Sequence, residues 1–113
     1  MRPGEIYLAQ FPFGDVPGMK LRPVLLLTGT LGSIPEVLVA YISSVVPTQP
    51  LPSDILLDPS QPGFRETHLK TKSALRLHKL ATIHSSSIVR YLGIIDLSVK
   101  DAVSSKLRDL LGL

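Results

Sequence analysis

The stretch Val37-Leu38-Val39-Ala40-Tyr41-Ile42-Ser43 has the alternation of a β-strand. Successive side chains of a strand point to opposite faces, so one face carries Val37, Val39, Tyr41 and Ser43, and the other carries Leu38, Ala40 and Ile42. Upstream, residues 23–28 form a nearly continuous apolar run, as expected of a buried strand. A turn over residues 29–35 separates the two segments, and together they predict a β-sheet.

Further strands are expected on both sides of this pair, at residues 5–11, 54–57, 73–83 and 91–95. Polar or Gly/Pro-rich segments separate them, the longest at residues 12–20 and 58–72, and residues 85–90 are expected to form a single helical turn. Short strands in this number usually curl into a small barrel. The sequence therefore predicts a mainly β fold.

The C-terminal segment has the period of an α-helix. Ser98 is a candidate N-cap, with Asp101 three residues later in a capping signature. Gly112 is a natural terminator. One helical face would carry Val99, Ala102, Val103, Leu107, Leu110 and Leu111. We expect this helix to pack across the open side of the barrel.

Composition limits the class of protein. The 113 residues fit one domain, residues 1–113, and 44% of them are apolar. The absence of cysteine excludes disulfides, thiol chemistry and Cys-containing zinc sites. His68, His78 and His84 lack the spacing of a metal site, and no phosphate-binding glycine motif is present. We expect neither a metal nor a cofactor.

The chain also lacks signals for a membrane or for export. No apolar run approaches the ~20 residues of a membrane span. The start, Met1-Arg2-Pro3-Gly4-Glu5, lacks the apolar stretch and cleavage site of a signal peptide. We therefore expect a cytoplasmic protein with no membrane partner.

The charge distribution is asymmetric. The net charge is +3, from 12 basic and 9 acidic residues, and the pI is near 9.5. Between residues 59 and 95 the only acid is Glu66, whereas the cations are Arg65, Lys70, Lys72, Arg76, Lys79 and Arg90. Such a basic strip is typical of nucleic-acid binding. It is equally typical of a solvated edge strand protected by charge.

Two short motifs could belong to a binding site. Lys20-Leu21-Arg22-Pro23 sets two cations before the buried strand, where Arg22 could hold a phosphate bidentately. Alternatively, these are solvated loop charges. Ser43 and Ser44 place two hydroxyls at the end of an apolar strand, where such groups more often satisfy local backbone groups.

Four segments, in this order, resemble the MazF/PemK family of toxin endoribonucleases from bacterial toxin–antitoxin systems. Gly4-Glu5-Ile6-Tyr7 is similar to the family's opening G-[DE]-[IV]-[YW]. Arg22-Pro23-Val24-Leu25-Leu26-Leu27 resembles its R-P-[VA]-[LV]-[VI] strand, and Val39-Ala40-Tyr41-Ile42-Ser43-Ser44 its strand ending in I-T-[SA]. Residues 73–83, SALRLHKLATI, stand in place of S-V-[IL]-L-x-[EQ]-[QIV]-R-T-I.

The resemblance implies an SH3-like barrel of the CcdB/MazF type, a homodimer and a protein antitoxin. It also implies metal-independent cleavage of single-stranded RNA to 2′,3′-cyclic phosphate and 5′-hydroxyl ends. The family's catalytic arginine and threonine correspond to Arg22 and Ser43, and its RNA-gating loop corresponds to residues 13–21. We expect RNA contacts from Lys20, Ser44, Lys72, Arg76, His78 and Lys79.

Two departures from the family pattern leave alternatives open. Serine replaces the threonine at Ser43, and Ala81 replaces the arginine of R-T-I. A non-cleaving RNA-binding barrel is therefore one alternative, and a CcdB-like toxin that poisons gyrase is another. Arg22 suits stabilisation of phosphate charge, but an arginine side chain stays protonated in proteins and is a poor general base. His78 is the candidate proton acceptor.

Overall fold

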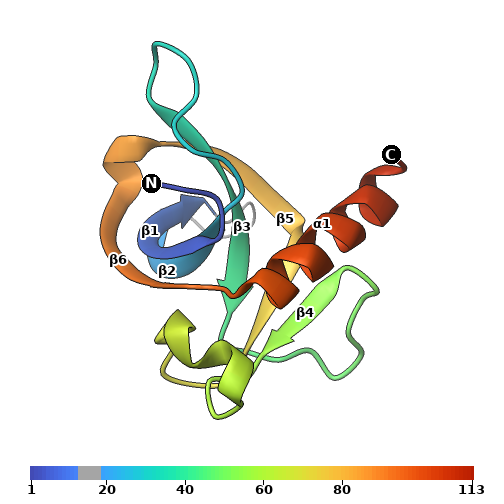
Figure 1. Ribbon diagram of the computed structural model, residues 1–113. Helices are drawn as coiled ribbons and strands as arrows, with labels where there is room; N and C mark the ends of the chain where they lie inside the picture. Colours follow the sequence, from blue (N-terminus) through green and yellow to red (C-terminus); the bar gives the residue numbers. More distant parts are fainter. Residues whose placement is uncertain (13–18) are drawn as a thin grey trace.

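The structure is a computed structural model that describes residues 1–12 and 19–113. Its core element is a six-stranded antiparallel sheet with the order β4-β5-β3-β2-β1-β6 (Figure 1). The elements are β1 (Glu5–Pro12), β2 (Met19–Leu26), β3 (Glu36–Ser43), β4 (Asp54–Leu57), the 3₁₀ helix η1 (Pro62–Thr67), β5 (Ser73–His84), the 3₁₀ helix η2 (Ser85–Ser87), β6 (Ile88–Ile94) and α1 (Leu97–Leu111). The RNA-gating loop expected over residues 13–21 falls mostly outside the described residues.

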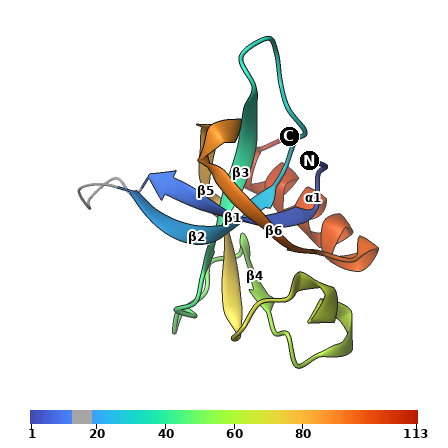
Figure 2. The ribbon, with the colours of Figure 1, turned by 90° about the vertical axis from the view of Figure 1, so that its left-hand side faces the viewer.

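The mainly β fold with a C-terminal helix is confirmed. The sheet curves strongly, so that β1 and β6 cross in front of β3 in the view of Figure 2. It does not close: β4 and β6 are its two edges. The largest differences from the sequence prediction are two strand starts: β2 begins at Met19 rather than Pro23, and β6 begins at Ile88 rather than Tyr91.

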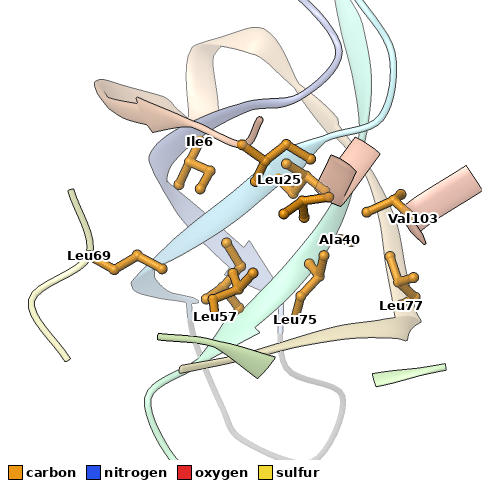
Figure 3. Close-up of a cluster of buried hydrophobic side chains, with 11 residues drawn as sticks. Ile6, Leu25, Ala40, Leu57, Leu69, Leu75, Leu77 and Val103 are labelled. Carbon is orange, nitrogen blue, oxygen red and sulfur yellow. The ribbon is translucent and has the colours of Figure 1, made fainter. Parts of the chain in front are cut away.

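Both faces of the central strand are covered. Ala40 and Ile42 of β3 pack in one cluster with Ile6, Leu25, Leu57, Leu75 and Leu77 (Figure 3). Val37, Val39 and Tyr41, which alternate with them, pack in a second cluster with Ala9, Phe11, Val24, Leu26 and Ile83. The alternation predicted for residues 37–43 is therefore correct, and both sets of side chains are buried except for Leu38, which is half-buried.

Helix α1 starts earlier than the sequence suggests. The N-cap is Asp96, whose Oδ1 accepts a hydrogen bond from the backbone N–H of Val99 at 3.0 Å. Ser98, the expected cap, lies inside the helix and donates its hydroxyl to the same Asp96 oxygen at 2.7 Å. Asp96 thus satisfies one of the free backbone donors of the first turn, and the predicted N-cap was wrong by two residues.

The helix packs on the sheet through its N-terminal half. Val99 and Val103 are buried in the first core cluster, with Leu107 beside them. Leu110 and Leu111, predicted on the same face, are exposed because they lie beyond the sheet. The helix ends as predicted at Gly112, which adopts a left-handed conformation with φ 70°. Among the described helices, none is long and apolar enough to cross a membrane.

The edge strand β6 is covered by η1. A Cβ at Gly93 would overlap the backbone carbonyl oxygens of Glu66 and Thr67, so glycine permits this close approach of two backbones. Next to it, the Nδ1 atom of His68 lies 2.8 Å from the carbonyl oxygen of Leu92. These contacts occupy part of an edge that would otherwise be open to another strand.

Candidate nucleic-acid interface

The two residues expected to be catalytic come from neighbouring strands. Strands β2 and β3 pair from Leu26–Val39 to Val24–Tyr41. Arg22 lies two residues from Val24 along β2, and Ser43 two residues from Tyr41 along β3, so each shares the side of its strand with that residue. Opposite residues of an antiparallel pair point to the same side of the sheet. The register therefore assigns both residues to the face that carries Tyr41, which we call the Tyr41 face.

Ser43 uses its hydroxyl locally. The residue is only 8% exposed. Its Oγ donates to the carbonyl oxygen of Val45 and accepts from the N–H of Val45, both at 3.1 Å. This is the backbone-satisfying role that the sequence left open. Because the Ser43 hydroxyl is bonded to Val45, it would first have to turn away from Val45 in order to react. The adjacent Ser44, by contrast, is exposed.

The Tyr41 face combines aromatic and cationic groups. The rings of Phe11 and Tyr41 stack with centroids 5.4 Å apart, and the Nζ of Lys79 lies 5.5 Å from the Tyr41 centroid. A cation at this distance from an aromatic face is attracted to it. Lys20 pairs with Phe11 at the start of β2. Arg22 is half-buried, and its Nη1 donates to the carbonyl oxygen of Leu21 at 3.0 Å.

Arg76 and His78 face a carboxylate. The Nε of Arg76 lies 2.7 Å from Oδ1 of Asp54, and the two side chains are 18% and 3% exposed. The pair lacks hydrogen-bond geometry, so its attraction is between charges. The Nδ1 of His78 lies 3.9 Å from the same oxygen. Burial and then the charge of Arg76 lower the pKa of His78, although Asp54 opposes this. Arg76 is thus held by Asp54.

Lys72 contacts a different carboxylate from Arg76. It is exposed, and its Nζ is 4.0 Å from Oδ2 of Asp58. Exposed pairs of this kind contribute little to stability and leave the cation able to bind other anions. The basic strip of the sequence is therefore divided. Lys72 and Arg76 lie near carboxylates, whereas Lys79 lies over the Tyr41 ring.

A cavity opens where β2 and β3 separate. Pro23 has no backbone N–H to donate, and the β2–β3 pairs end one residue away, at Val24–Tyr41. β3 continues beyond this point against β5 to the pair Ser43–Ala74. The two strands thus part at Pro23 and Ile42. The cavity there has a volume of about 560 Å³.

This cavity, which we call the basic cavity, is lined by cations, hydroxyls and aliphatic side chains. None of its described lining residues is acidic. They are Leu8, Leu21, Arg22, Pro23, Ile42, Ser44, His68, Leu69, Lys70, Thr71, Ser73, Arg90 and Leu92. A cationic cavity without a carboxylate favours an anionic ligand.

His68 is held in an unusual conformation at the cavity. It has a φ of 53° and ends η1 in the left-handed region, which non-glycine residues seldom adopt. Its Nδ1 lies 2.8 Å from the carbonyl oxygen of Leu92. A carbonyl can only accept, so Nδ1 must carry the hydrogen, and Nε2 is the acceptor of the neutral ring.

Sequence reasoning found part of this arrangement. It singled out Arg22 and Ser44, and it counted Lys70 and Arg90 only as members of a basic strip. It proposed His78 as a proton acceptor and considered His68 only as a possible metal ligand. The missing information was the positive φ of His68 and the folding of η1 against β6, which no local pattern of the sequence indicates.

Comparison with solved structures shows where this fold occurs. The Mycobacterium tuberculosis toxin MazF-mt6 is 24% identical, with a TM-score of 0.74, over 96% of this chain and 97% of that one. An endoribonuclease in complex with its cognate antitoxin, from a mycobacterial species, is 16% identical, with a TM-score of 0.70, over 100% and 96%. MazF from Deinococcus radiodurans is 18% identical, with a TM-score of 0.72, over 100% and 97%.

These identities establish the shared fold, and family membership rests on the sequence itself. No curated protein matches the chain. The family model of the PemK-like, MazF-like toxins of type II toxin–antitoxin systems, however, matches residues 2–111. This range contains all four segments on which the resemblance was based. The chain belongs to the PemK/MazF family of toxins of type II toxin–antitoxin systems.

Proposed function

We propose that this protein is a toxin endoribonuclease that cleaves single-stranded RNA without a metal ion and is neutralised by a cognate antitoxin. The observation that carries the proposal is the family match over residues 2–111. Arg22 stands at the family's arginine position, and beside it lies a cationic cavity whose described lining has no acid. A structural relative is described as an endoribonuclease in complex with its antitoxin, which supports the same pairing here.

The reaction follows from the chemistry of RNA. The ribose 2′-oxygen attacks the adjacent phosphorus and loses its proton to a base, while the bond from phosphorus to the 5′-oxygen breaks. The leaving 5′-oxygen takes up a proton, which gives a 2′,3′-cyclic phosphate and a 5′-hydroxyl. Negative charge grows on the non-bridging oxygens, where the fixed donors of Arg22 would stabilise it. Ser43, once turned from Val45, would donate to one of these oxygens.

The residues expected to bind RNA lie in different parts of the site. Lys20 and Lys79, on the Tyr41 face, would hold phosphates near Arg22, and the exposed Lys72 would extend the positive surface. Ser44 offers a hydroxyl from the wall of the basic cavity. Arg76 and His78 support this role less, because both lie against Asp54. We also propose that the protein is a homodimer and acts in the cytoplasm.

A second candidate is an RNA-binding barrel without cleavage. The local hydrogen bonds of Ser43 and the presence of Ala81 instead of arginine favour it. The deciding experiment is incubation of the purified protein with mixed single-stranded RNA in EDTA, followed by mapping of the new 5′ ends. We expect cleavage with 5′-hydroxyl ends. Intact RNA that is nevertheless bound would favour the second candidate, and 5′-phosphate ends would contradict the mechanism.

A further inference from the structure

The basic cavity brings two cations of the strip, Lys70 and Arg90, together, and none of its described lining residues is acidic. Arg76 pairs with Asp54, and Lys72 with Asp58. Within residues 1–12 and 19–113, neither Lys70 nor Arg90 forms an ion pair, and both are exposed. Two cations that share a cavity repel each other unless an anion lies between them. Their joint position therefore favours a bound anion.

The basic cavity lies on the other side of the sheet from the expected catalytic face. Leu8 of β1 pairs with Pro23 on one side and with Arg90 on the other. These three residues therefore share a face. The neighbouring pair, Ala9 with Arg22, belongs to the opposite face. Arg22 nevertheless lines the cavity as well, so the cavity borders the expected catalytic residue.

The lining suits a nucleotide better than a bare inorganic ion. Leu8, Ile42, Leu69 and Leu92 form an aliphatic part of the wall, and Lys70 and Arg90 a charged part. A base could cover the aliphatic part while its phosphate meets the cations. Ser44, Thr71 and the Nε2 of His68 add polar groups for the edge of a base or for a ribose hydroxyl.

We infer that the basic cavity is a second RNA subsite, which binds nucleotides flanking the cleaved phosphate through Lys70 and Arg90. This inference rests on the proposed function, since it assigns a further part of the same RNA to the opposite face of β2. Chemistry then belongs to the Tyr41 face, and part of the affinity belongs to the cavity.

The test compares the double variant Lys70→Ala/Arg90→Ala with Lys100→Ala/Arg108→Ala. The control pair removes the same two charges from exposed positions of α1 that do not line the cavity. The probe is a fluorescent, mixed-sequence single-stranded RNA with 2′-O-methyl groups, which cannot be cut. We expect the cavity variant to bind on the order of tenfold more weakly and to lower the salt-dependence slope by about 1.4. We expect the control to bind like the wild type.

Further measurements separate the possible failures. The charge-conserving variant Lys70→Arg/Arg90→Lys should bind like the wild type, and this result would show that loss of charge rather than misfolding weakens the alanine variant. Equal affinity and equal salt slope in all variants would overturn the inference. So would sedimentation showing that the cavity variant loses a subunit contact while its RNA affinity is kept. If the wild type binds but does not cut unmodified RNA, the proposed cleavage fails while the subsite stands.

Discussion

Gly93 is the residue on which the covered edge of the sheet depends. It lets the Glu66–Thr67 backbone lie against β6. We predict that Gly93→Ala lowers the free energy of unfolding by about 3 kcal/mol, because a methyl group there would push two backbones apart. Gly29→Ala is the matched control, since its Cβ would meet only the Met1 carbonyl oxygen at 3.4 Å, an ordinary contact. Urea denaturation of both variants measures the difference, and equal stabilities would contradict the prediction.

Arg22 and Ser43 test the proposed chemistry. We predict that Arg22→Ala lowers the rate at saturating RNA on the order of a hundredfold, because the transition state loses about 3 kcal/mol of charge stabilisation. RNA affinity should fall much less, since Lys72 and Lys79 remain. Ser43→Ala should slow cleavage with little change in binding, and Ser43→Thr, which restores the family's residue, should keep activity. Single-turnover cleavage measures these rates. Wild-type rates for both alanine variants would refute the site assignment.

The residues of the site show what a sequence can and cannot give. Arg22 and Ser43 were predicted because their motifs match a family in order and spacing. Lys70 and Arg90 were visible only as charges, because the cavity that joins them depends on Pro23 ending the β2–β3 pairs and on η1 folding against β6. These are contacts between segments far apart in the chain. No local pattern encodes them.

At the level of elements, the short strand β4 is fastened to β5 by the pair of Asp54 and Arg76. The carboxylate is 3% exposed and also accepts a hydrogen bond from the N–H of Leu51 at 2.8 Å. We predict that Arg76→Ala lowers the free energy of unfolding by about 3 kcal/mol, because it leaves a buried charge without its partner. Urea denaturation measures this change.

A double-mutant cycle provides the control for that pair. Asp54→Ala/Arg76→Ala should be less destabilised than the sum of the two single variants, since it leaves no charge behind. Wild-type stability of Arg76→Ala would contradict the structural role. If that variant instead lost RNA affinity by a full unit of salt slope, the binding role expected from the sequence would be correct.

The sequence predicted elements better than their ends. The strand at residues 54–57 and the helix terminator Gly112 were correct. The helix start was placed at Ser98 because Ser-x-x-Asp matches a capping signature, whereas Asp96 competes for the same role and has it in the structure. The helix η1 was read as loop, because its Pro62-Gly63 start is equally typical of a turn.

At the scale of the whole molecule, we predict a homodimer at micromolar concentration. Exposed apolar side chains gather on the edge strand β6, where Val89, Tyr91 and Ile94 are 52%, 49% and 40% exposed. A surface of this kind is typical of an interface between subunits. Sedimentation equilibrium measures the mass directly. A monomer with full RNA-cleaving activity would contradict the prediction, and Val89→Asp should shift the equilibrium toward the monomer if β6 forms the contact.

Strand β2 lies between the Tyr41 face and the basic cavity, and this arrangement has an evolutionary consequence. Adjacent residues of one strand serve different faces, with Arg22 assigned to one and Leu21 and Pro23 to the other. With an RNA subsite in the basic cavity, substitutions at Lys70, Thr71 or Arg90 would alter which transcripts are held while leaving the cutting residues untouched. Related toxins could thus acquire new targets by drift in the cavity alone, and an engineer could redirect this chain along the same route.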